Sequence, residues 1–402
     1  MKKVVRKNQQ YLSSPQADLS RRLRMLPAAA GVLMLLASIH ADAAESSKFR
    51  QPSVGAFGGE IAAPADNPGF FGTAFVTYTK IEGVVDDNGD PIKIAGRSVP
   101  LPTGTPTGGA IPNGTYSFNV PSSEVTLTQS QAQVNLVAGY LTESTYADGR
   151  VAFALNVPLV KQSREFAATP VTGTITPTPP AAMPAPLRGA ISAVGAAVNT
   201  QVQAALAAQS ASQNADASGL GDTEISVVWV RHQNQLKIAA GASLYAPTGV
   251  YDKTRGPNPG FGNFYTLRPG VAVTYAVNPD KASNGWDSGV TVAGRVSYGI
   301  NTINKETDYK SGNFVYAETA ISKVTGQWAF GANLVRLQQV SDDSGAGVPA
   351  GTGRYSTNSV GPFLSYKLPE QDAGFNLLYS QTFGGRNALE TKSLQLRFIK
   401  AW

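Results

Sequence analysis

Apolar residues occupy every second position in many segments of this chain. Within 288–302 one face carries Val290, Val292, Val296, Tyr298 and Ile300. The same repeat continues to the end of the sequence, in SLQLRFIKAW, which closes on Trp402. A period of two predicts a β-strand with one apolar face and one polar face. The pattern therefore predicts an all-β protein whose final strand runs to the carboxyl terminus.

Twelve such segments follow one another from residue 70 onward. We expect strands at 70–82, 116–141, 150–166, 222–232, 235–247, 264–278, 288–302, 311–324, 326–341, 354–369, 373–384 and 391–402. The second segment is unusually long and is compatible with two shorter strands. Beyond the amino-terminal region, no apolar run approaches the ~18–20 residues that a membrane-spanning helix needs.

The connections between these expected strands alternate in length. The long ones are 83–115, 167–221, 248–263, 342–353 and, less markedly, 303–310 and 385–390. Outer-membrane barrels have an even number of strands, short periplasmic turns and long extracellular loops, whereas a soluble sandwich has no reason to sort its loops in this way. We therefore expect a transmembrane antiparallel β-barrel of about 12 strands with both termini on the periplasmic side.

The composition agrees with a barrel in lipid. Charged residues make up 15% of the chain, below the ~25% of ordinary soluble domains, and hydrophobic residues 42%. A barrel combines these values because its apolar outer face is averaged with a polar interior. The four Trp residues also lie near expected strand ends, as in the aromatic girdles of such barrels: Trp229, Trp286, Trp328 and Trp402.

The amino terminus has the features of a secretory signal peptide. Basic residues precede the apolar stretch MLPAAAGVLMLLASIHA, and the small residues ADAA follow it. We expect a signal peptide at 1–43, whose removal takes away seven positive and two negative charges and lowers the net charge from +6 to +1. The basic excess thus belongs to the signal and does not indicate a nucleic-acid partner. Export and a barrel together predict the bacterial outer membrane.

The expected barrel spans 70–402, and two other segments lack its strand pattern. The first, 44–69, is rich in Gly, Pro and Ala and is expected to be periplasmic or luminal. The second, 167–218, is an extracellular insertion with a Pro- and Thr-rich part and a short amphipathic helix. Its apolar residues recur at helical spacing: Leu187, Ile191, Val194, Val198, Val202 and Leu206. The insertion is either a lid or plug at the pore mouth or a solvated elaboration.

Several sequence stretches carry a family resemblance. EIAAPADNPGFFGTAFVTYTKI, GLGDTEISVVW, QQVSDDSGAG and the closing LRFIKAW resemble the outer-membrane transporters of the phenol meta-pathway degradation family. These are distant relatives of the long-chain fatty-acid transporters. The resemblance implies a channel for passive uptake of small hydrophobic or aromatic compounds. The relatives' amino-terminal hatch also implies that 44–69 plugs the lumen.

Strand parity places a set of charged residues toward the interior. Arg268, Arg295 and Arg397 oppose apolar outward positions, and Glu318 and Arg336 are expected to be luminal too, although their strands alternate less cleanly. Parity has energetic support because an Arg or Lys on the lipid face at mid-depth costs about 2–4 kcal/mol. These residues either line a polar constriction or brace the barrel through salt bridges. Lys400 falls on the lipid-facing parity, close to the interface.

Candidate chemistry outside the interior is sparse. Asp342 and Asp343 lie at a loop tip, where they are candidate gate residues that bind a cation weakly or solvate the loop. His232, the one histidine beyond the signal, lies in an expected turn, and a hydrolase would need it beside a nucleophile. The absence of Cys excludes disulfides and thiolate metal sites. We expect no enzyme and no cofactor.

These patterns support one main hypothesis and two alternatives. The main one is a monomeric outer-membrane channel for small hydrophobic or aromatic solutes, surrounded by outer-membrane lipid and recognised by the barrel-assembly machinery through its carboxyl-terminal strand. The alternatives are a barrel hydrolase that uses His232 and a structural or adhesive surface barrel. No feature indicates nucleic-acid binding.

Overall fold

The computed structural model describes residues 49–52, 54–55, 68–100, 116–177, 185–254, 256–277, 289–349 and 351–402. The chain divides into two compact units. The smaller includes Ile94–Ser123 and Thr169–Gln209, and the larger includes His40–Lys93, Glu124–Ala168 and Ser210–Trp402. The expected signal peptide, 1–43, lies outside the described residues.

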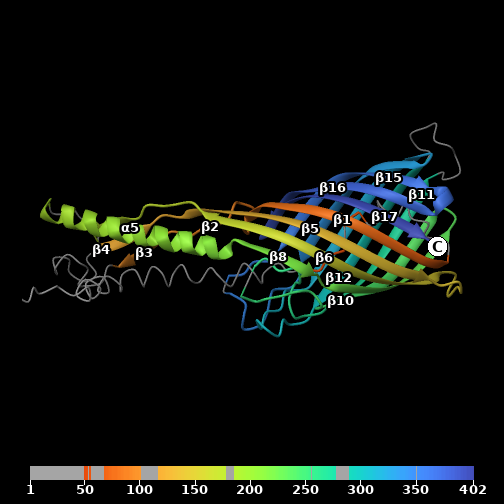
Figure 1. Cartoon of the computed structure of the whole chain (residues 1–402), viewed down its shortest axis with the longest axis horizontal. Coiled ribbons are helices and arrows are strands. Elements are labelled where there is room, and N and C mark those ends of the chain that lie inside the picture. The colour runs from red at the N-terminus through yellow and green to blue at the C-terminus, as the bar shows by residue number, and fades with distance from the viewer. Residues whose placement is uncertain are drawn as a thin grey trace, which may run out of the picture. The chain divides into compact units, whose positions relative to one another are not determined.

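The larger unit is a closed antiparallel barrel of tilted strands, as Figure 1 shows. Its twelve strands are β1 (Gly69–Val85), β5 (Ser123–Leu141), β6 (Arg150–Ala168), β9 (Thr223–Gln233), β10 (Leu236–Ala246), β11 (Thr266–Val277), β12 (Val290–Asn301), β13 (Phe314–Thr325), β14 (Trp328–Gln339), β15 (Ser356–Leu368), β16 (Ala373–Arg386) and β17 (Ala388–Ala401). Each pairs with its neighbour, and β17 pairs with β1 to close the ring. The predicted fold class and strand number are confirmed.

The two ends of the barrel carry different connections. We call one the short-turn end, because it holds the turns 142–149, 234–235, 326–327 and 369–372 and the carboxyl terminus. The 369–372 turn contains η2 (Pro369–Gln371). The opposite, long-loop end holds the connections 86–122, 169–222, 247–265, 302–313 and 340–355. The expected loop at 385–390 is wrong, because β16 and β17 continue until Asn387 alone joins them, with a φ of 47°.

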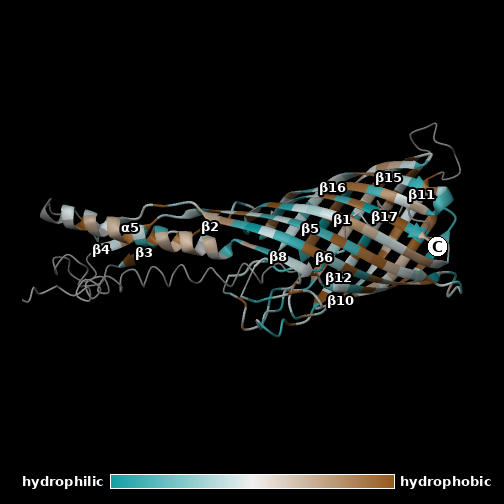
Figure 2. Ribbon diagram, viewed as in Figure 1, coloured by the Kyte–Doolittle hydropathy of each residue, from teal (hydrophilic) through white to brown (hydrophobic). Residues whose placement is uncertain are grey.

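The outer face of the barrel is apolar along most of each strand. On β16 and β17, Leu377 and Leu396 lie opposite each other and are both exposed, and Val292 and Val296 of β12 are exposed as predicted. Figure 2 shows hydrophobic residues, in brown, interspersed with polar ones along the barrel strands. A soluble protein rarely exposes an apolar surface of this extent, so lipid is the environment that matches it.

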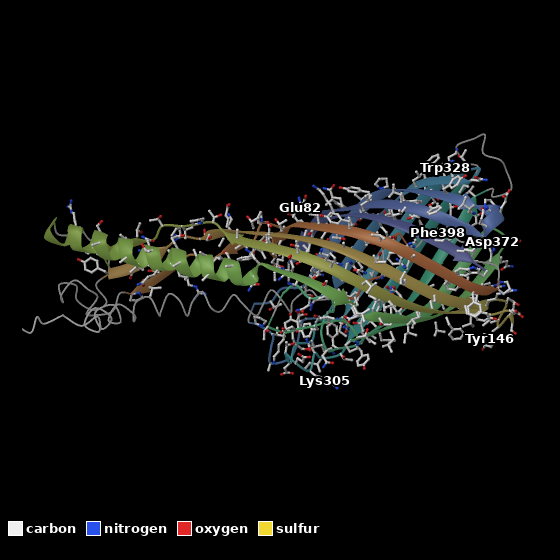
Figure 3. The ribbon with its side chains drawn as sticks, in the orientation of Figure 1. Glu82, Tyr146, Lys305, Trp328, Asp372 and Phe398 are labelled. Atoms are coloured by element: carbon white, nitrogen blue, oxygen red, sulfur yellow. The ribbon has the colours of Figure 1, made fainter. Side chains whose placement is uncertain are left out.

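Aromatic rings gather at the short-turn end. The ring centroids of Trp328 and Tyr366 lie 4.5 Å apart, and those of Phe375 and Phe398 lie 5.0 Å apart. Trp402 is 69% exposed at the same end. Figure 3 shows Trp328 and Phe398 at that end, with Glu82 and Lys305 farther along the barrel. Such rings favour the headgroup level of a bilayer, so they mark one edge of the membrane-spanning band.

The smaller unit combines a sheet with a long helix. Strands β3 (Arg97–Pro100), β4 (Tyr116–Val120) and β7 (Thr174–Pro177) form an antiparallel sheet, and α5 spans Ala185–Gln213. The expected segment 116–141 is therefore two strands, and β4 belongs to this three-stranded sheet rather than to the barrel sheet. Four residues of α5 at helical spacing are buried: Ile191, Val198, Val202 and Leu206.

Side-chain bonds attach α5 to the segment that precedes it. Asn199 of α5 accepts a hydrogen bond from the Gly173 amide at 2.7 Å and donates one to its carbonyl at 2.9 Å. The helix has 29 residues and is longer than predicted. None of the helices in the described part of the chain is both long and apolar enough to cross a membrane.

Two short strands extend the edges of the barrel sheet. β2 (Lys93–Ile94) pairs with β5, and β8 (Ala215–Leu220) pairs with β6 beyond the point where β9 ends. Leu159 lies opposite Leu220, whereas Asn156 lies opposite Glu224. The partner of β6 thus changes from β9 to β8 near Pro158, and Gly221 and Asp222 occupy the break.

The apolar outer face predicts a depth-dependent penalty for charge. Leu377→Arg should lower the free energy of unfolding in lipid vesicles by about 2–4 kcal/mol, because the charge would face the hydrocarbon core. Gln371→Arg, in the exposed turn at the short-turn end, is the control and should cost less than about 1 kcal/mol. Guanidinium titration followed by tryptophan fluorescence measures both. Equal costs at the two positions would contradict a membrane-facing surface.

Candidate functional site

Buried ion pairs occupy the interior of the barrel. Arg268 of β11 contacts Glu224 of β9 at 2.8 Å, and Arg295 of β12 contacts Glu318 of β13. Arg295 and Glu318 face each other in the strand register, so the pair follows directly from strand alternation. The structure places four of the five predicted charged residues on the inner side: Arg268, Arg295, Glu318 and Arg397.

Glu318 is the most connected of these groups. Its side chain is fully buried and accepts hydrogen bonds from Arg295, from Tyr316 Oη at 3.0 Å and from Asn333 Nδ2 at 3.2 Å. It also accepts one at 2.7 Å from the backbone amide of Gly55, in the amino-terminal segment. A buried carboxylate is tolerated only when it is paired and hydrogen-bonded, so this set of donors explains its position.

Arg397 has a different environment. It is buried, its guanidinium lies 5.0 Å from the centre of the Phe75 ring, and its Nη2 donates to Gln395 at 2.9 Å. Gln395 in turn donates to Thr77 at 3.0 Å. Arg397 therefore joins β17 to β1 at the seam where the barrel closes.

Residues 49–55, where described, lie inside the barrel. Arg50 donates to Asp222 through Nε at 2.9 Å and Nη2 at 2.8 Å, a two-pronged contact between nearly fully buried side chains. It also donates to the carbonyls of Phe264 at 2.7 Å and Gly262 at 3.1 Å. The guanidinium lies 3.9 Å from the centre of the Phe264 ring. Arg50 thus anchors the segment to the long-loop end.

Asp222 holds the neighbouring loop as well. It accepts hydrogen bonds from the backbone amides of Gly249 at 3.0 Å and Phe261 at 2.8 Å, both in the 247–265 connection. It lies in the two-residue break between β8 and β9, where the chain leaves the sheet. One carboxylate therefore connects the barrel wall, a loop and the amino-terminal segment.

Apolar contacts fix the segment on either side of Glu318. Phe49 packs in a buried aromatic cluster, with its ring centroid 5.1 Å from that of Phe314 and 5.2 Å from that of Tyr355. Val54 packs against a second cluster, which includes Leu378 and Phe363. Residues 49–52 and 54–55 are thus bound along the inner wall rather than outside the barrel.

A chain of amide side chains runs along the inner faces of β5 and β6. Gln162 donates to Gln131 at 2.6 Å, Gln131 to Gln133 at 2.8 Å, and Gln133 to Asn135 at 2.8 Å. Asn135 then donates to Asn156 at 2.9 Å. We call these five residues the amide ladder. Its last member, Asn156, donates to Glu224 at 3.3 Å and so connects the ladder to Arg268.

Arg336 is not on the inner face, so its predicted luminal position is wrong. It is exposed and shares the outward parity of β14 with Phe330 and Leu334. It donates to Asn358 at 2.8 Å and to Gln338 at 2.7 Å. Arg336 lies close to the long-loop end of its strand, where an outward charge costs only about 0–1 kcal/mol. Parity arguments based on that cost fail at strand ends.

The carboxylates of Asp342 and Asp343 form hydrogen bonds within and between the loops of the long-loop end. Asp342 accepts a hydrogen bond from Arg354 at 2.6 Å, and this bond and charge lower the pKa of Asp342 from its ordinary value. Asp343 accepts from Tyr309 and, at 2.7 Å, from the Gly312 amide, so it joins two neighbouring connections at the long-loop end. Among the described residues, no group of three or more His, Cys, Asp or Glu side chains is arranged to hold a metal ion.

His232 lies in the β9–β10 region at the short-turn end. It is exposed, and its Nε2 lies 3.0 Å from the carbonyl oxygen of Asn234 in the same turn. That contact is local to the turn.

Sequence reasoning missed three parts of this site. It did not single out Arg50 or Asp222, which lie 172 positions apart in the sequence. It also missed the amide ladder, although QSQAQVN at 129–135 places Gln or Asn at every second position. That period of two, in polar rather than apolar residues, was the available signal.

The comparisons with known proteins agree with this geometry. A family model described as "Putative MetA-pathway of phenol degradation" matches residues 115–398. The chain belongs to this family. None of the curated proteins compared with it matches.

Among solved structures, an outer-membrane channel from Pseudomonas putida F1 is similar, with a TM-score of 0.55 and 11% identity, over 88% of this chain and 100% of that one. A FadL homologue from Pseudomonas aeruginosa matches with a TM-score of 0.34 and 10% identity over 90% and 97% of the two chains. The toluene transporter TbuX from Ralstonia pickettii matches with 0.35 and 7% over 87% and 93%. The first of these shows that the fold is that of an outer-membrane channel.

The buried Glu318 predicts a large effect of its removal on stability. Glu318→Ala should destabilise the folded barrel by about 3–5 kcal/mol, because Arg295 would lose its carboxylate partner in the interior. The control is Glu82→Ala, which removes an exposed pair with Lys392 and should cost less than about 1 kcal/mol. Chemical unfolding in vesicles measures the difference. Similar costs for the two variants would argue against a buried charge network.

Proposed function

We propose that the protein is an outer-membrane channel for the passive uptake of small hydrophobic or aromatic compounds. The observation that carries this proposal is a closed barrel with an apolar exterior, a polar and charged interior, and residues of the amino-terminal segment bound inside it. Membership of a family described by phenol degradation and the fold of an outer-membrane channel support it. A passive channel needs no cofactor, and we propose that the protein is not an enzyme.

The proposed orientation places the short-turn end in the periplasm and the long-loop end outside the cell. This assignment follows the loop lengths of outer-membrane barrels. It puts the smaller unit, which includes 169–209 of the expected insertion 167–218, on the extracellular side, and the carboxyl-terminal strand where the assembly machinery would recognise it. We propose a monomer, since closure leaves the barrel ring without an unpaired strand edge.

Within the channel, we propose that the interior charges form a constriction and that the amino-terminal segment closes it. Arg268 donates to the Arg50 carbonyl and Glu318 accepts from the Gly55 amide, so both hold the segment. Arg295 pairs with Glu318, and Arg50 attaches the segment at the long-loop end. Arg397 would line the wall closer to the periplasm. Asp342 and Asp343 are proposed to keep the outer loops in place beside the mouth rather than to bind a cation.

The hydrolase alternative has little support. His232 lies in an exposed turn, and its described ring contact is to a backbone carbonyl of the same turn.

The function is tested by uptake into cells. Cells that carry the protein in an outer membrane with intact lipopolysaccharide should take up ¹⁴C-labelled toluene or phenol faster than cells with the empty vector. A sugar of similar size should show a smaller gain, because the proposed channel favours hydrophobic and aromatic solutes. Equal uptake of all solutes with and without the protein would contradict a channel and favour a surface protein.

If residues 49–55 restrict the channel, weakening the contact between Arg50 and Asp222 should open it. Arg50→Lys keeps the positive charge but loses the two-pronged contact with Asp222, so it should raise the mean conductance in planar bilayers. Lys93→Ala, in an exposed pair with Glu124, is the control and should leave conductance unchanged. The heat-dependent shift of folded barrels in SDS gels verifies that both variants fold. Unchanged conductance in a folded Arg50→Lys protein would rule out Arg50 as the anchor of a gate.

A further inference from the structure

We propose that the amide ladder is a hydrogen-bonding track for the solute, so that the channel favours aromatic compounds with a hydroxyl group over unsubstituted aromatic hydrocarbons. This inference rests on the proposed channel function and names the solute class within it. The ladder comprises Gln131, Gln133, Asn135, Asn156 and Gln162.

The ladder retains hydrogen-bonding capacity after its internal bonds are counted. A primary amide offers two N–H donors and an oxygen with two lone pairs. In the chain of bonds, Gln131 and Gln133 each use one donor and one acceptor. Both side chains are only partly buried, as is Asn156. Counted among the described residues, each therefore has a donor and an acceptor left for a molecule that moves along the inner wall.

Gln162 provides an independent indication of a ligand. Only 7% of Gln162 is exposed, and its Nε2 donates to Gln131. Its Oε1 is buried and has no hydrogen-bond partner among the described residues. A buried acceptor without a partner is costly, and a hydroxyl group that donates to it removes that cost. A hydrocarbon has no such donor.

The same physics disfavours hydrocarbons. An aromatic hydrocarbon that slides over the ladder displaces water from amide groups and gives no bond in return. A site that hydrogen-bonds a hydroxyl group discriminates strongly against the analogue that lacks it, because its polar groups are then left unpaired. The aromatic ring is common to both solute classes, so it does not distinguish between them.

The position of the ladder fits a route into the barrel. On its long-loop side, Arg164 donates to Gln129 at 2.9 Å, two residues before Gln131. At the opposite end of the ladder, Asn156 donates to Glu224, which also accepts a hydrogen bond from Arg268. Arg268 in turn donates to the carbonyl of Arg50 at 3.2 Å. A solute that follows the ladder thus arrives at the bonds that hold the amino-terminal segment.

The experiment compares two solutes that differ by one hydroxyl group. Initial uptake of ¹⁴C-phenol and ¹⁴C-toluene is measured in cells that carry one of three proteins. These are the native protein, a double variant that combines Gln131→Leu with Gln133→Leu, and the single variant Gln162→Leu. We expect both variants to lower the phenol-to-toluene ratio by about threefold to tenfold, as the loss of one or more hydrogen bonds predicts. Toluene uptake itself should not fall.

The control is Gln381→Leu, the same change at an exposed glutamine on β16 outside the ladder. It should leave the ratio unchanged, and the gel shift of the folded barrel confirms that each variant is assembled. If the native protein transports both solutes and the variants keep its ratio, the hydroxyl track is overturned while the channel stands. If the native protein speeds the uptake of neither solute, the channel function and the track both fall.

Discussion

Backbone hydrogen bonding in lipid is the constraint on which the rest of this structure depends. A peptide group at membrane depth has no water to bind, so each strand needs a partner on both sides. Twelve strands meet that need by closing β17 onto β1, where the Trp402 amide donates to the Phe70 carbonyl at 2.9 Å. Once the ring is closed, alternation sends one set of side chains to lipid and the other to the interior. The charges can then lie only inside or at the strand ends.

The interior charges share with two buried apolar clusters the role that a hydrophobic core has in a soluble protein. Arg295 and Glu318, Arg268 and Glu224, and Arg50 and Asp222 satisfy one another, and the same groups hold loops and the amino-terminal segment. Each pair is therefore both a brace of the wall and a contact for what lies within it. In the proposed channel, this double role means that stability and opening are coupled in the same few side chains.

The sequence predicted the barrel better than it predicted the site. Period-two alternation and loop lengths are local signals, and they located strands such as β12 and β16 with small errors at the ends. The inner position of Arg295 followed from parity because lipid penalises charge at mid-depth. Arg336 did not follow this parity, because it lies near a strand end, where an outward charge costs little. Arg50 and Asp222 could not be paired from the sequence, because their contact depends on how a strandless segment lies inside the ring.

The closure of the ring has a consequence for the order of assembly. Residues 49–55 precede the first strand, yet they contact residues of β13 and β16 inside a ring that only the last strand completes. The segment must either be in position before the seam joins or thread into a finished cylinder. The first route is simpler, because the open sheet can fold around a segment that is already present. The barrel then closes around a segment that is already bound to its inner wall, and the described residues before β1 shape the space that the final strand encloses.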